Sequence, residues 1–460
     1  MNKTAMINEA EGLLEFIDAS PSSFHVIENI KKELNGYTEL KEDEDWDLKA
    51  GKGYYVTRNS SSIIAFCLPK SLKAVDIKGF NIAAAHSDSP AFKIKNDGEI
   101  IVEDSYIKLN VEKYGGAIMA PWLDRPLSIA GRIFVQGKKG VEEKLVNIDR
   151  DLLIIPNVAI HMNRDVNDGY KFNVKTDMQP LMCATAPGGK PEKGTLYRLI
   201  AKAAGVKKDS ILSTDLFLYP RVKSAFLGAD NEMIAARALD DLECAYSLVR
   251  GFLSGADAKG KGRSAGKGTD KEDIGKKAGI PVCCVFDNEE TGSLTRQGAD
   301  SDFLRDTLYR ITACMNRAAG EERDVNESLM RMLAGSFMIS ADNAHALHPN
   351  HPEYADATDR PVLNGGVVVK FNASQKYTTD ACSHAYIKGL AKEAGIPVQT
   401  YSNRPDIAGG STLGNLSGRH VSIPSADIGL AQLAMHSCYE TAGTYDIGYL
   451  IRLITRFYSS

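Results

Sequence analysis

The sequence predicts an α/β protein that has a central, mostly parallel sheet flanked by helices and a β-rich domain inserted into the first. Short apolar runs alternate with amphipathic stretches, and several runs are apolar at nearly every position, as in strands covered on both faces. Between about residues 91 and 227 this alternation gives way to short extended segments separated by Gly, Asn and Asp. With 460 residues, the chain also exceeds what one hydrophobic core usually organises.

The apolar runs define the strands that we expect, and the amphipathic stretches define the helices. The predicted strands are 63–68, 81–85, 280–286, 336–339, 367–371 and 421–423. The predicted helices are 6–16, 234–253, 303–315, 382–394 and 444–457. Strands that alternate with helices in this way favour a layered α/β architecture.

The domain boundaries follow from where the alternation stops and resumes. We expect residues 1–90 and 228–460 to form the α/β domain and residues 91–227 to form the insertion. The insertion contains the extended segments YIKLNVEKYG, LSIAGRIFVQG and LLIIPNVAIHMN. These short extended segments, separated by Gly, Asn and Asp turns, indicate a β-rich domain inserted into the α/β domain.

Composition excludes several classes of protein. A net charge of −4 with 43% hydrophobic residues indicates a globular chain without the basic field that attracts nucleic acid. No run approaches the ~20 apolar residues that span a bilayer. The N-terminal segment lacks an unbroken apolar core, so we expect no secretory signal and a cytoplasmic protein.

The cysteines and one glycine-rich segment invite interpretations that the spacing does not support. None of the eight cysteines forms a CxxC pair, so we expect no disulfides and no thiolate metal site. Any metal would therefore be held by His, Asp and Glu. The Gly/Lys-rich segment 255–279 lacks the GxxxxGK[ST] pattern of a phosphate-binding loop, and we expect a surface loop.

Two polar clusters follow apolar strands in the first and third quarters of the chain. In AAAHSDSP, His86 and Asp88 share one face of an extended chain, so the carboxylate can orient an imidazole whose other nitrogen binds metal. In PVCCVFDNEETGS, a buried strand delivers Glu289 and Glu290 side by side, a repulsive arrangement unless cations compensate it. A satisfied loop histidine and a solvated acidic turn are the alternative interpretations.

Two further clusters have structural alternatives of their own. In SADNAHALHPN, Asp342 comes directly after an apolar strand, and His345 and His348 come after Asp342. These residues could bind metal, or the histidines could form hydrogen bonds within a local turn. In ARALDDL, Asp240 and Asp241 begin a helix, where the helix dipole favours acidic residues regardless of function. All four clusters lie at strand ends or helix starts, the edge at which open α/β sheets bind ligands. With His436, they supply the His and carboxylate ligands that two divalent ions sharing a carboxylate require.

The chain resembles the M18 metallopeptidases, the aspartyl aminopeptidase and aminopeptidase I group. The resemblance is collinear over nearly the whole chain, and the Gly/Lys-rich segment is the main part that it does not explain. It is carried by AAAHSDSP, LDRPLSIAGR, PNVAIHMNR, ARALDDL, DNEETGS, SADNAHALHPN, VVKFNASQKYTTD and AMHSCYE. It implies a di-zinc peptidase-like fold, an inserted dimerisation domain, and dimers that assemble into a dodecamer.

The resemblance also implies roles for individual residues. One metal ion would be held by His86, Asp240 and Asp342, and a second by Asp240, Glu290 and His436. The remaining implied roles are Glu289 as general base, Asp88 as the residue that orients His86, His161 as a group reaching into a neighbouring subunit's active site, and Lys370, Tyr377 and His345 in the substrate site. The family usually has Asn after its bridging Asp, so Asp241 leaves an exchange of the two aspartates open. Lys370 could pair with an acidic substrate side chain or with a backbone carbonyl.

The expected function is a metal-dependent aminopeptidase that acts on peptides with a free N-terminus, with Asp and Glu as candidate N-terminal residues. Two divalent ions per subunit are expected, zinc first, with cobalt or manganese also fitting the ligands. The alternatives are a deblocking or glutamyl-type tetrahedral aminopeptidase and a shell-forming protein with structural metals.

Overall fold

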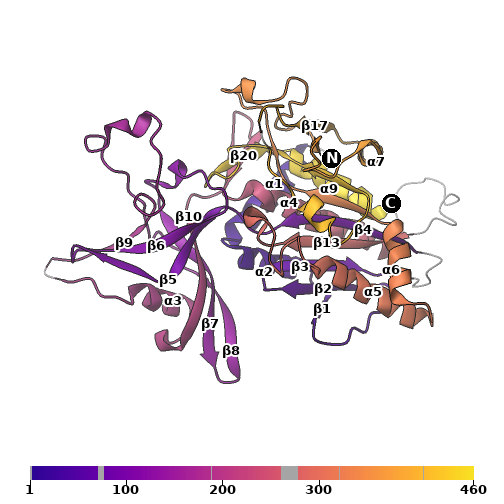
Figure 1. Ribbon diagram of the computed structural model, residues 1–460, viewed down its shortest axis with the longest axis horizontal. Helices are drawn as coiled ribbons and strands as arrows, with labels where there is room; N and C mark the ends of the chain where they lie inside the picture. The colour runs from indigo at the N-terminus through magenta and orange to yellow at the C-terminus, as the bar shows by residue number, and fades with distance from the viewer. Residues whose placement is uncertain (1–2, 71–76, 188, 261–277, 321, 408) are drawn as a thin grey trace.

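The computed structural model describes residues 3–70, 77–187, 189–260, 278–320, 322–407 and 409–460. An α/β part built on one large sheet lies beside a smaller part built on an antiparallel sheet (Figure 1). This arrangement confirms the predicted fold class.

The large sheet has nine strands, and its parallel centre positions the candidate site. Its order is β1 (Thr38–Leu40), β2 (Gly53–Arg58), β3 (Ser62–Cys67), β13 (Ala278–Phe286), β4 (Ile77–His86), β14 (Phe337–Ala341), β18 (Ser425–Gly429), β16 (Val367–Phe371) and β17 (Val398–Ser402). The four strands β13, β4, β14 and β18 run parallel to one another. Their carboxyl ends therefore meet at one edge.

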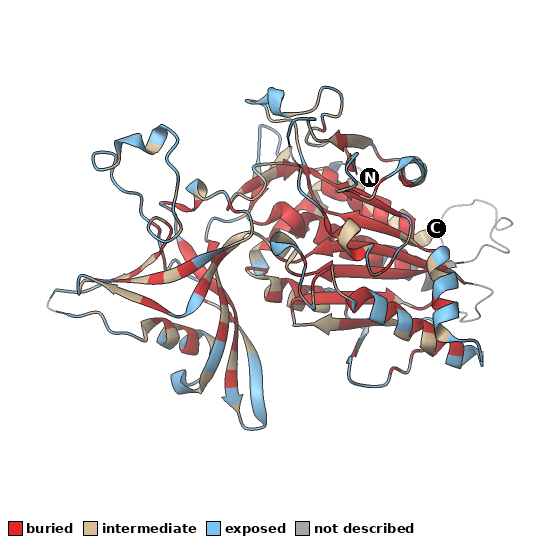
Figure 2. Ribbon diagram, viewed as in Figure 1, coloured by how far each residue is buried: buried red, intermediate tan, exposed pale blue. Residues whose placement is uncertain are grey.

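Helices cover both faces of this sheet, which explains why its central strands are largely apolar on both faces. In β4, Ala83 and Ala85 belong to one core, and Ile82 and Ala84 belong to the other, because successive side chains point to opposite faces. The first core is closed by α1 (Lys3–Ala19), α2 (Ser23–Glu33), α4 (Leu239–Gly260), α7 (Ala381–Ala394) and α9 (Asp446–Ser459). The second is closed by α5 (Phe303–Ala319), α6 (Val325–Ala334) and α8 (Leu413–Ser417). The central strands are buried along nearly their whole length (Figure 2).

The antiparallel sheet has six strands and a hydrophobic core of its own. Its order is β8 (Gly140–Asn147), β7 (Leu127–Gly137), β10 (Ile211–Pro220), β5 (Ala91–Val102), β6 (Tyr106–Tyr114) and β9 (Leu181–Ala184). α3 (Thr195–Ala204) packs on this core through Leu196 and Ile200. All six strands come from the stretch predicted to be an insertion.

A third, five-stranded sheet lies next to the large one. It contains β11 (Ala225–Leu227), β12 (Met233–Ala236), β20 (Glu440–Gly443), β19 (Ala431–Leu433) and β15 (Ala344–His345), in that order. This sheet brings the chain after Asp342 next to the chain before His436, since β15 pairs with β19.

Two predicted elements are wrong. Residues 421–423 are not a strand, because the strand in this region begins at Ser425, after Pro424, as β18. Residues 234–236 are the strand β12, paired with β20, and the helix predicted from residue 234 begins only at Leu239. Pairing with a strand distant in sequence overrides the apolar periodicity of IAARAL.

Three observations bear on the remaining predictions. All eight cysteines lie in the described residues, and none of them forms a disulfide. Within the described ranges, no helix is long and apolar enough to cross a bilayer. Most of the Gly/Lys-rich segment, residues 261–277, lies outside the described residues.

Candidate metal centre

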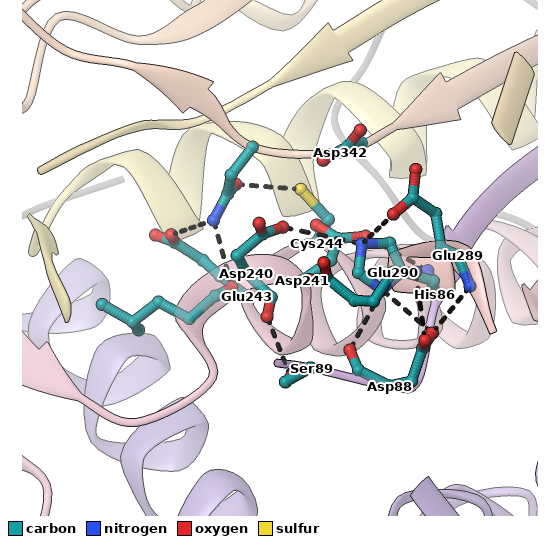
Figure 3. Close-up of polar contacts among 12 residues, drawn as sticks. His86, Asp88, Ser89, Asp240, Asp241, Glu243, Cys244, Glu289, Glu290 and Asp342 are labelled. Carbon is teal, nitrogen blue, oxygen red and sulfur yellow. Dashed lines mark hydrogen bonds and ion pairs between the residues drawn. The ribbon is translucent and has the colours of Figure 1, made fainter. Parts of the chain in front are cut away.

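The candidate centre lies where the carboxyl ends of the parallel strands meet. His86 is the last residue of β4, Asp342 follows β14, and the turn with Glu289 and Glu290 follows β13. Asp240 lies at the start of α4, and His436 lies between β19 and β20. The close-up shows several of these side chains pointing toward one another from different elements (Figure 3).

Three overlapping groups of side chains offer ligand atoms within 4.8 Å of one another. They are His86 with Asp240 and Asp342, His86 with Glu289 and Glu290, and Asp240 with Glu290 and His436. The first and third groups are the two ligand sets that the sequence resemblance implies. They share Asp240.

Asp240 directs its two carboxylate oxygens toward two different histidines. Its Oδ1 is 3.5 Å from His86 Nε2, and its Oδ2 is 3.3 Å from His436 Nε2. The carboxylate of Asp241 points elsewhere and accepts a hydrogen bond from the backbone N–H of His86 at 3.2 Å. The geometry therefore favours Asp240 over Asp241 as the shared carboxylate.

Asp88 organises both His86 and the glutamate turn. The Nδ1 of His86 is 3.0 Å from the backbone oxygen of Asp88 and 3.4 Å from its carboxylate, which leaves Nε2 facing the other ligands. The Asp88 carboxylate also accepts hydrogen bonds from the backbone N–H groups of Glu289 and Glu290, both at 3.1 Å. The buried Asp88 carboxylate thus contacts His86 of the first ligand group and the backbone of Glu290 in the other.

The two glutamates occupy different positions. They begin a short 3₁₀ turn after Asn288, whose φ of 64° is left-handed. The Oε2 of Glu290 is 3.4 Å from His436 Nε2, and its side chain is 3% exposed. The Oε2 of Glu289 is 4.0 Å from His86 Nε2, and its side chain is 16% exposed. Glu290 is thus enclosed among the ligands, whereas Glu289 reaches toward solvent.

Burial shifts the protonation of this cluster. It raises the pKa of Glu289 to about 8, with the nearby carboxylates of Asp342 and Asp88 adding to the shift and His86 opposing it. Burial also raises the pKa of Glu290 well above its usual value, and Asp240 adds to that shift. So many carboxyl groups in one buried space favour either bound protons or bound cations.

Two carboxylate oxygens in the cluster have no hydrogen-bond partner, and this observation tests whether the residues fit metal ions. The Oδ1 of Asp240 and the Oε1 of Glu290 are buried and accept no hydrogen bond within the described chain. Buried, unsatisfied carboxylate oxygens are costly in a metal-free fold, and imidazole and carboxylate are the ligands that Zn²⁺ takes in hydrolases. The donor set therefore fits divalent cations.

Lys370 contacts the cluster from β16. Its Nζ donates to the backbone oxygen of Asn343 at 2.9 Å, lies 3.5 Å from Asp342 Oδ2, and sits 5.2 Å from the centre of the Tyr377 ring. Lys370 is 2% exposed. It makes the backbone-carbonyl bond that the sequence left as one of two alternatives.

A cavity of about 440 Å³ opens beside the cluster. Its wall includes His345, three residues after Asp342, and Met435, which directly precedes His436. Tyr401 also lines it and packs edge-on against His345, with ring centres 5.9 Å apart. Lys370 and Tyr377 are not part of its wall.

His348 and His351 do bond within the local turn, to the Asn350 N–H and to Glu353.

His161 lies away from these residues, on the long exposed connection that precedes β9 in the antiparallel domain. Among the described residues, no hydrogen bond or ion pair involves its side chain. Its neighbours Val158, Ile160 and Met162 are 51%, 46% and 82% exposed. The connection projects away from the α/β domain at the upper left of Figure 1.

The sequence did not single out two residues that contact the cluster. Glu440, on β20, accepts hydrogen bonds from the backbone N–H groups of His436 at 2.6 Å and Asp240 at 3.0 Å. Tyr114, at the end of β6, donates its hydroxyl to Asp88 at 2.6 Å. Glu440 gives no signal in the sequence, since its 1% exposure is a property of the folded chain. Tyr114 gives no local signal, because its partner belongs to the other domain.

Comparison with known proteins agrees with this geometry. Residues 16–458 match the model of the family described as aminopeptidase I zinc metalloprotease (M18). A probable M18 family aminopeptidase 2 of Clostridium novyi is 42% identical over 463 residues, covering 100% of this chain and 99% of the relative. A protein of the same description from Clostridium acetobutylicum is 43% identical, covering 98% of each.

Solved structures show the same fold. The cryo-EM structure of an Ape4 and Nbr1 complex contains a chain that superposes with a TM-score of 0.88 at 32% identity, covering 100% of this chain and 87% of that one. The structure of an S. cerevisiae mApe1 dodecamer superposes with a TM-score of 0.81 at 25% identity, covering 98% of this chain and 96% of that one.

Proposed function

This chain belongs to the M18 family of zinc metallo-aminopeptidases, and we propose that it removes N-terminal residues from peptides with two metal ions that share Asp240. The observation that carries this proposal is the pair of three-residue ligand groups meeting at one carboxylate. His86, Asp240 and Asp342 would hold one ion, and Asp240, Glu290 and His436 would hold the other. Two divalent ions held there would supply Lewis acidity, which lowers the pKa of water and polarises a peptide carbonyl.

Glu289 is the proton carrier in this scheme. It is the least enclosed acid of the cluster, and none of its ligand atoms is needed by the two groups that share Asp240. As general base, its carboxylate takes a proton from the attacking water, and as general acid it passes that proton to the leaving amine. Asp88 keeps the backbone of Glu289 in place through the hydrogen bond at 3.1 Å.

The substrate approaches along the cavity beside Asp342 and His436. A free α-amine is a cation, and the carboxylates of the cluster attract it, which limits the enzyme to the first residue of a peptide. His345, in the cavity wall, meets the first side chain in this scheme, and Tyr377 lies behind it against Tyr401, with ring centres 6.5 Å apart. Lys370 donates a hydrogen bond to the Asn343 backbone and lies beside the Asp342 carboxylate. These contacts support a role in positioning Asp342, in addition to the expected role of binding acidic substrate side chains.

A panel of substrates tests the activity. Aminoacyl anilides that differ in their first residue should be hydrolysed, and the same anilides with an acetylated N-terminus should not. Chelation should abolish hydrolysis, and Zn²⁺, Co²⁺ or Mn²⁺ added back should restore it with different rates. Hydrolysis that survives complete metal removal, or that accepts blocked substrates equally, would contradict a metallo-aminopeptidase centred on Asp240.

The same panel separates the two roles of Lys370. If Lys370 only holds Asp342, Lys370→Met lowers kcat/KM for Asp, Glu, Leu and Ala substrates by similar factors. If it also binds acidic side chains, the ratio of the Asp rate to the Leu rate falls by at least tenfold. Charge-assisted pairing with a substrate carboxylate is worth that much.

We further propose that His161 acts in the active site of a second subunit. Its exposed position among exposed apolar residues supports docking onto another copy, and an mApe1 relative is described as a dodecamer. His161 would donate a hydrogen bond where negative charge develops on the substrate carbonyl.

Mixing subunits tests this role. His161→Ala and Glu289→Gln variants should each be weakly active, and co-assembly of the two should restore about a quarter of the parent activity if the sites pair two by two. Restoration follows because some sites then combine an intact Glu289 with an intact His161 from the neighbour. If mixed assemblies form but stay as inactive as the separate variants, His161 does not act across subunits.

The shell-protein alternative is separated by the same metal removal. A structural centre would lose its assembly without metal and would have no use for Glu289, whereas the enzyme loses turnover while Glu289 remains essential.

A further inference from the structure

We propose that the antiparallel domain builds one wall of the metal centre through residues 114–118, here called the YGG segment, and that this wall specifically positions Glu290 and His436. In the proposed function, Asp240 binds both ions, whereas Glu290 and His436 bind only the second ion. The inference therefore rests on the proposed function. It gives the antiparallel domain a role within its own subunit, in addition to any role in assembly.

The first contact is made by Tyr114, the last residue of β6. Its hydroxyl donates to Asp88 Oδ2 at 2.6 Å and accepts from the Asn288 side-chain amide at 2.9 Å. Both partners belong to the α/β domain and flank the glutamate turn. The ring itself is held by its own domain, edge-on to Phe217 of β10 with centres 5.5 Å apart. Tyr114 therefore connects the antiparallel sheet to the turn that carries Glu290.

The second contact is a close approach of backbone to Glu290. Gly115 has a φ of +72°, a left-handed conformation that other residues adopt at a cost. A Cβ at this position would lie 3.0 Å from Glu290 Cβ and 3.3 Å from Glu290 Oε2. The backbone at position 115 passes directly against the buried Glu290. Only glycine fits there, because it tolerates the left-handed conformation and has no Cβ to collide with the Glu290 side chain.

The third contact is with His436. A Cβ on Gly116 would lie 3.1 Å from the Nδ1 of His436, and the backbone N–H of Ile118 donates to the His436 backbone oxygen at 2.9 Å. On the other side, Glu440 accepts from the His436 backbone N–H. His436 has a left-handed φ of 68°, so its position depends on contacts from both sides.

Among the supports of the first ligand group, the YGG segment touches only Asp88, through the Tyr114 hydroxyl. His86 is held by Asp88 and by the Asp241 carboxylate, and Asp342 lies next to Lys370. A Cβ on Gly116 would meet two atoms within 4 Å, at 3.1 and 3.5 Å, and both belong to His436. A small change at Gly116 should therefore disturb one half of the centre and spare the other.

The experiment is a metal titration of the full-length, assembled protein with Co²⁺ after chelation. The parent should bind two equivalents per chain. We expect Gly116→Ala to keep the first equivalent at parental affinity and to bind the second at least tenfold more weakly, because the methyl group displaces His436. The kcat/KM of this variant should recover at raised Co²⁺ concentration, which a general loss of structure would not produce.

Two other variants keep the test decisive. Gly389→Ala, in α7, adds a methyl group that meets no atom within 4 Å, and it should titrate like the parent. Tyr114→Phe removes only the hydroxyl and adds no clash, so it tests the wall even if Gly116→Ala does not fold. Because this hydroxyl also holds Asp88, which contacts His86, we expect the second equivalent to weaken more than the first.

The outcomes distinguish this inference from the proposed function. If the parent binds two equivalents and hydrolyses peptides while Gly116→Ala and Tyr114→Phe bind both equivalents like Gly389→Ala, the wall has no positioning role. If both equivalents weaken equally in these variants, the selectivity for Glu290 and His436 is wrong. A parent that binds fewer than two equivalents overturns the two-ion function and this inference with it.

Discussion

Replacing Glu289 by Gln lowers kcat by a factor between about 10² and 10⁴, the range that general acid–base catalysis contributes. The amide keeps the size of the side chain but cannot accept the proton of the attacking water. Because Glu289 belongs to neither ligand group that shares Asp240, metal content should stay at the parental value and KM should change little. Initial rates on aminoacyl anilides, together with metal analysis of the same preparation, check both statements.

The neighbouring glutamate provides the matched control. Glu290→Gln should lose activity together with one metal ion, since the Oε2 of Glu290 lies 3.4 Å from His436 Nε2 and its other oxygen is buried and unpaired. Metal content therefore distinguishes the Glu289 variant from the Glu290 variant, which activity alone would not do. Turnover of Glu289→Gln within a few-fold of the parent would remove Glu289 from the catalytic role.

Replacing Asp240 by Ala abolishes the binding of both ions, because its two oxygens face the histidines of both ligand groups. Loss of a residue that only supports a ligand already costs about 10- to 100-fold in metal affinity, and loss of the shared ligand should cost more at each position. Activity should fall to the level of the chelated parent. Metal content after dialysis, measured by atomic absorption, gives the result directly.

Asp241 is the control for Asp240. Burial raises the pKa of Asp241 well above its usual value, with Asp342 adding to the shift and His86 opposing it. Asp241→Asn keeps the size of the side chain and an oxygen that can accept from the His86 backbone N–H, so it should retain both ions. If Asp241→Asn lost both ions and Asp240→Asn kept them, the two aspartates would have to exchange roles.

The buried sheet was predictable because its strands carry their signal in their own residues. Strands β3, β4, β13, β14 and β16 are apolar on both faces, and no alternative element explains so short and continuous a run. The strand β12 has a helix-like pattern and exists because β20, far away in the sequence, pairs with it. The helix α2 was not predicted, and its apolar positions pack on a core whose other members are distant in the chain.

The site residues that lie at the end of a strand, or directly after one, were predictable from the sequence. His86, Asp342 and the glutamate pair follow apolar runs, and the carboxyl ends of neighbouring parallel strands must meet. His436 lies after the three-residue strand β19, so no long apolar run precedes it, and only the family resemblance assigned it to a ligand group. Tyr114 contacts Asp88, 26 residues away in the chain, and Glu440 contacts Asp240, 200 residues away, and no local pattern encodes such contacts.

The distribution of ligands along the chain has a consequence for biosynthesis. His86 precedes the whole antiparallel sheet, Asp240 follows it, and His436 comes later still, after β19. A growing polypeptide on the ribosome can fold the antiparallel domain early, since domains fold as units in order of synthesis. The second ligand group cannot exist until His436 has been synthesised. A product that terminates before His436 therefore lacks this ligand group and is left with an inactive centre.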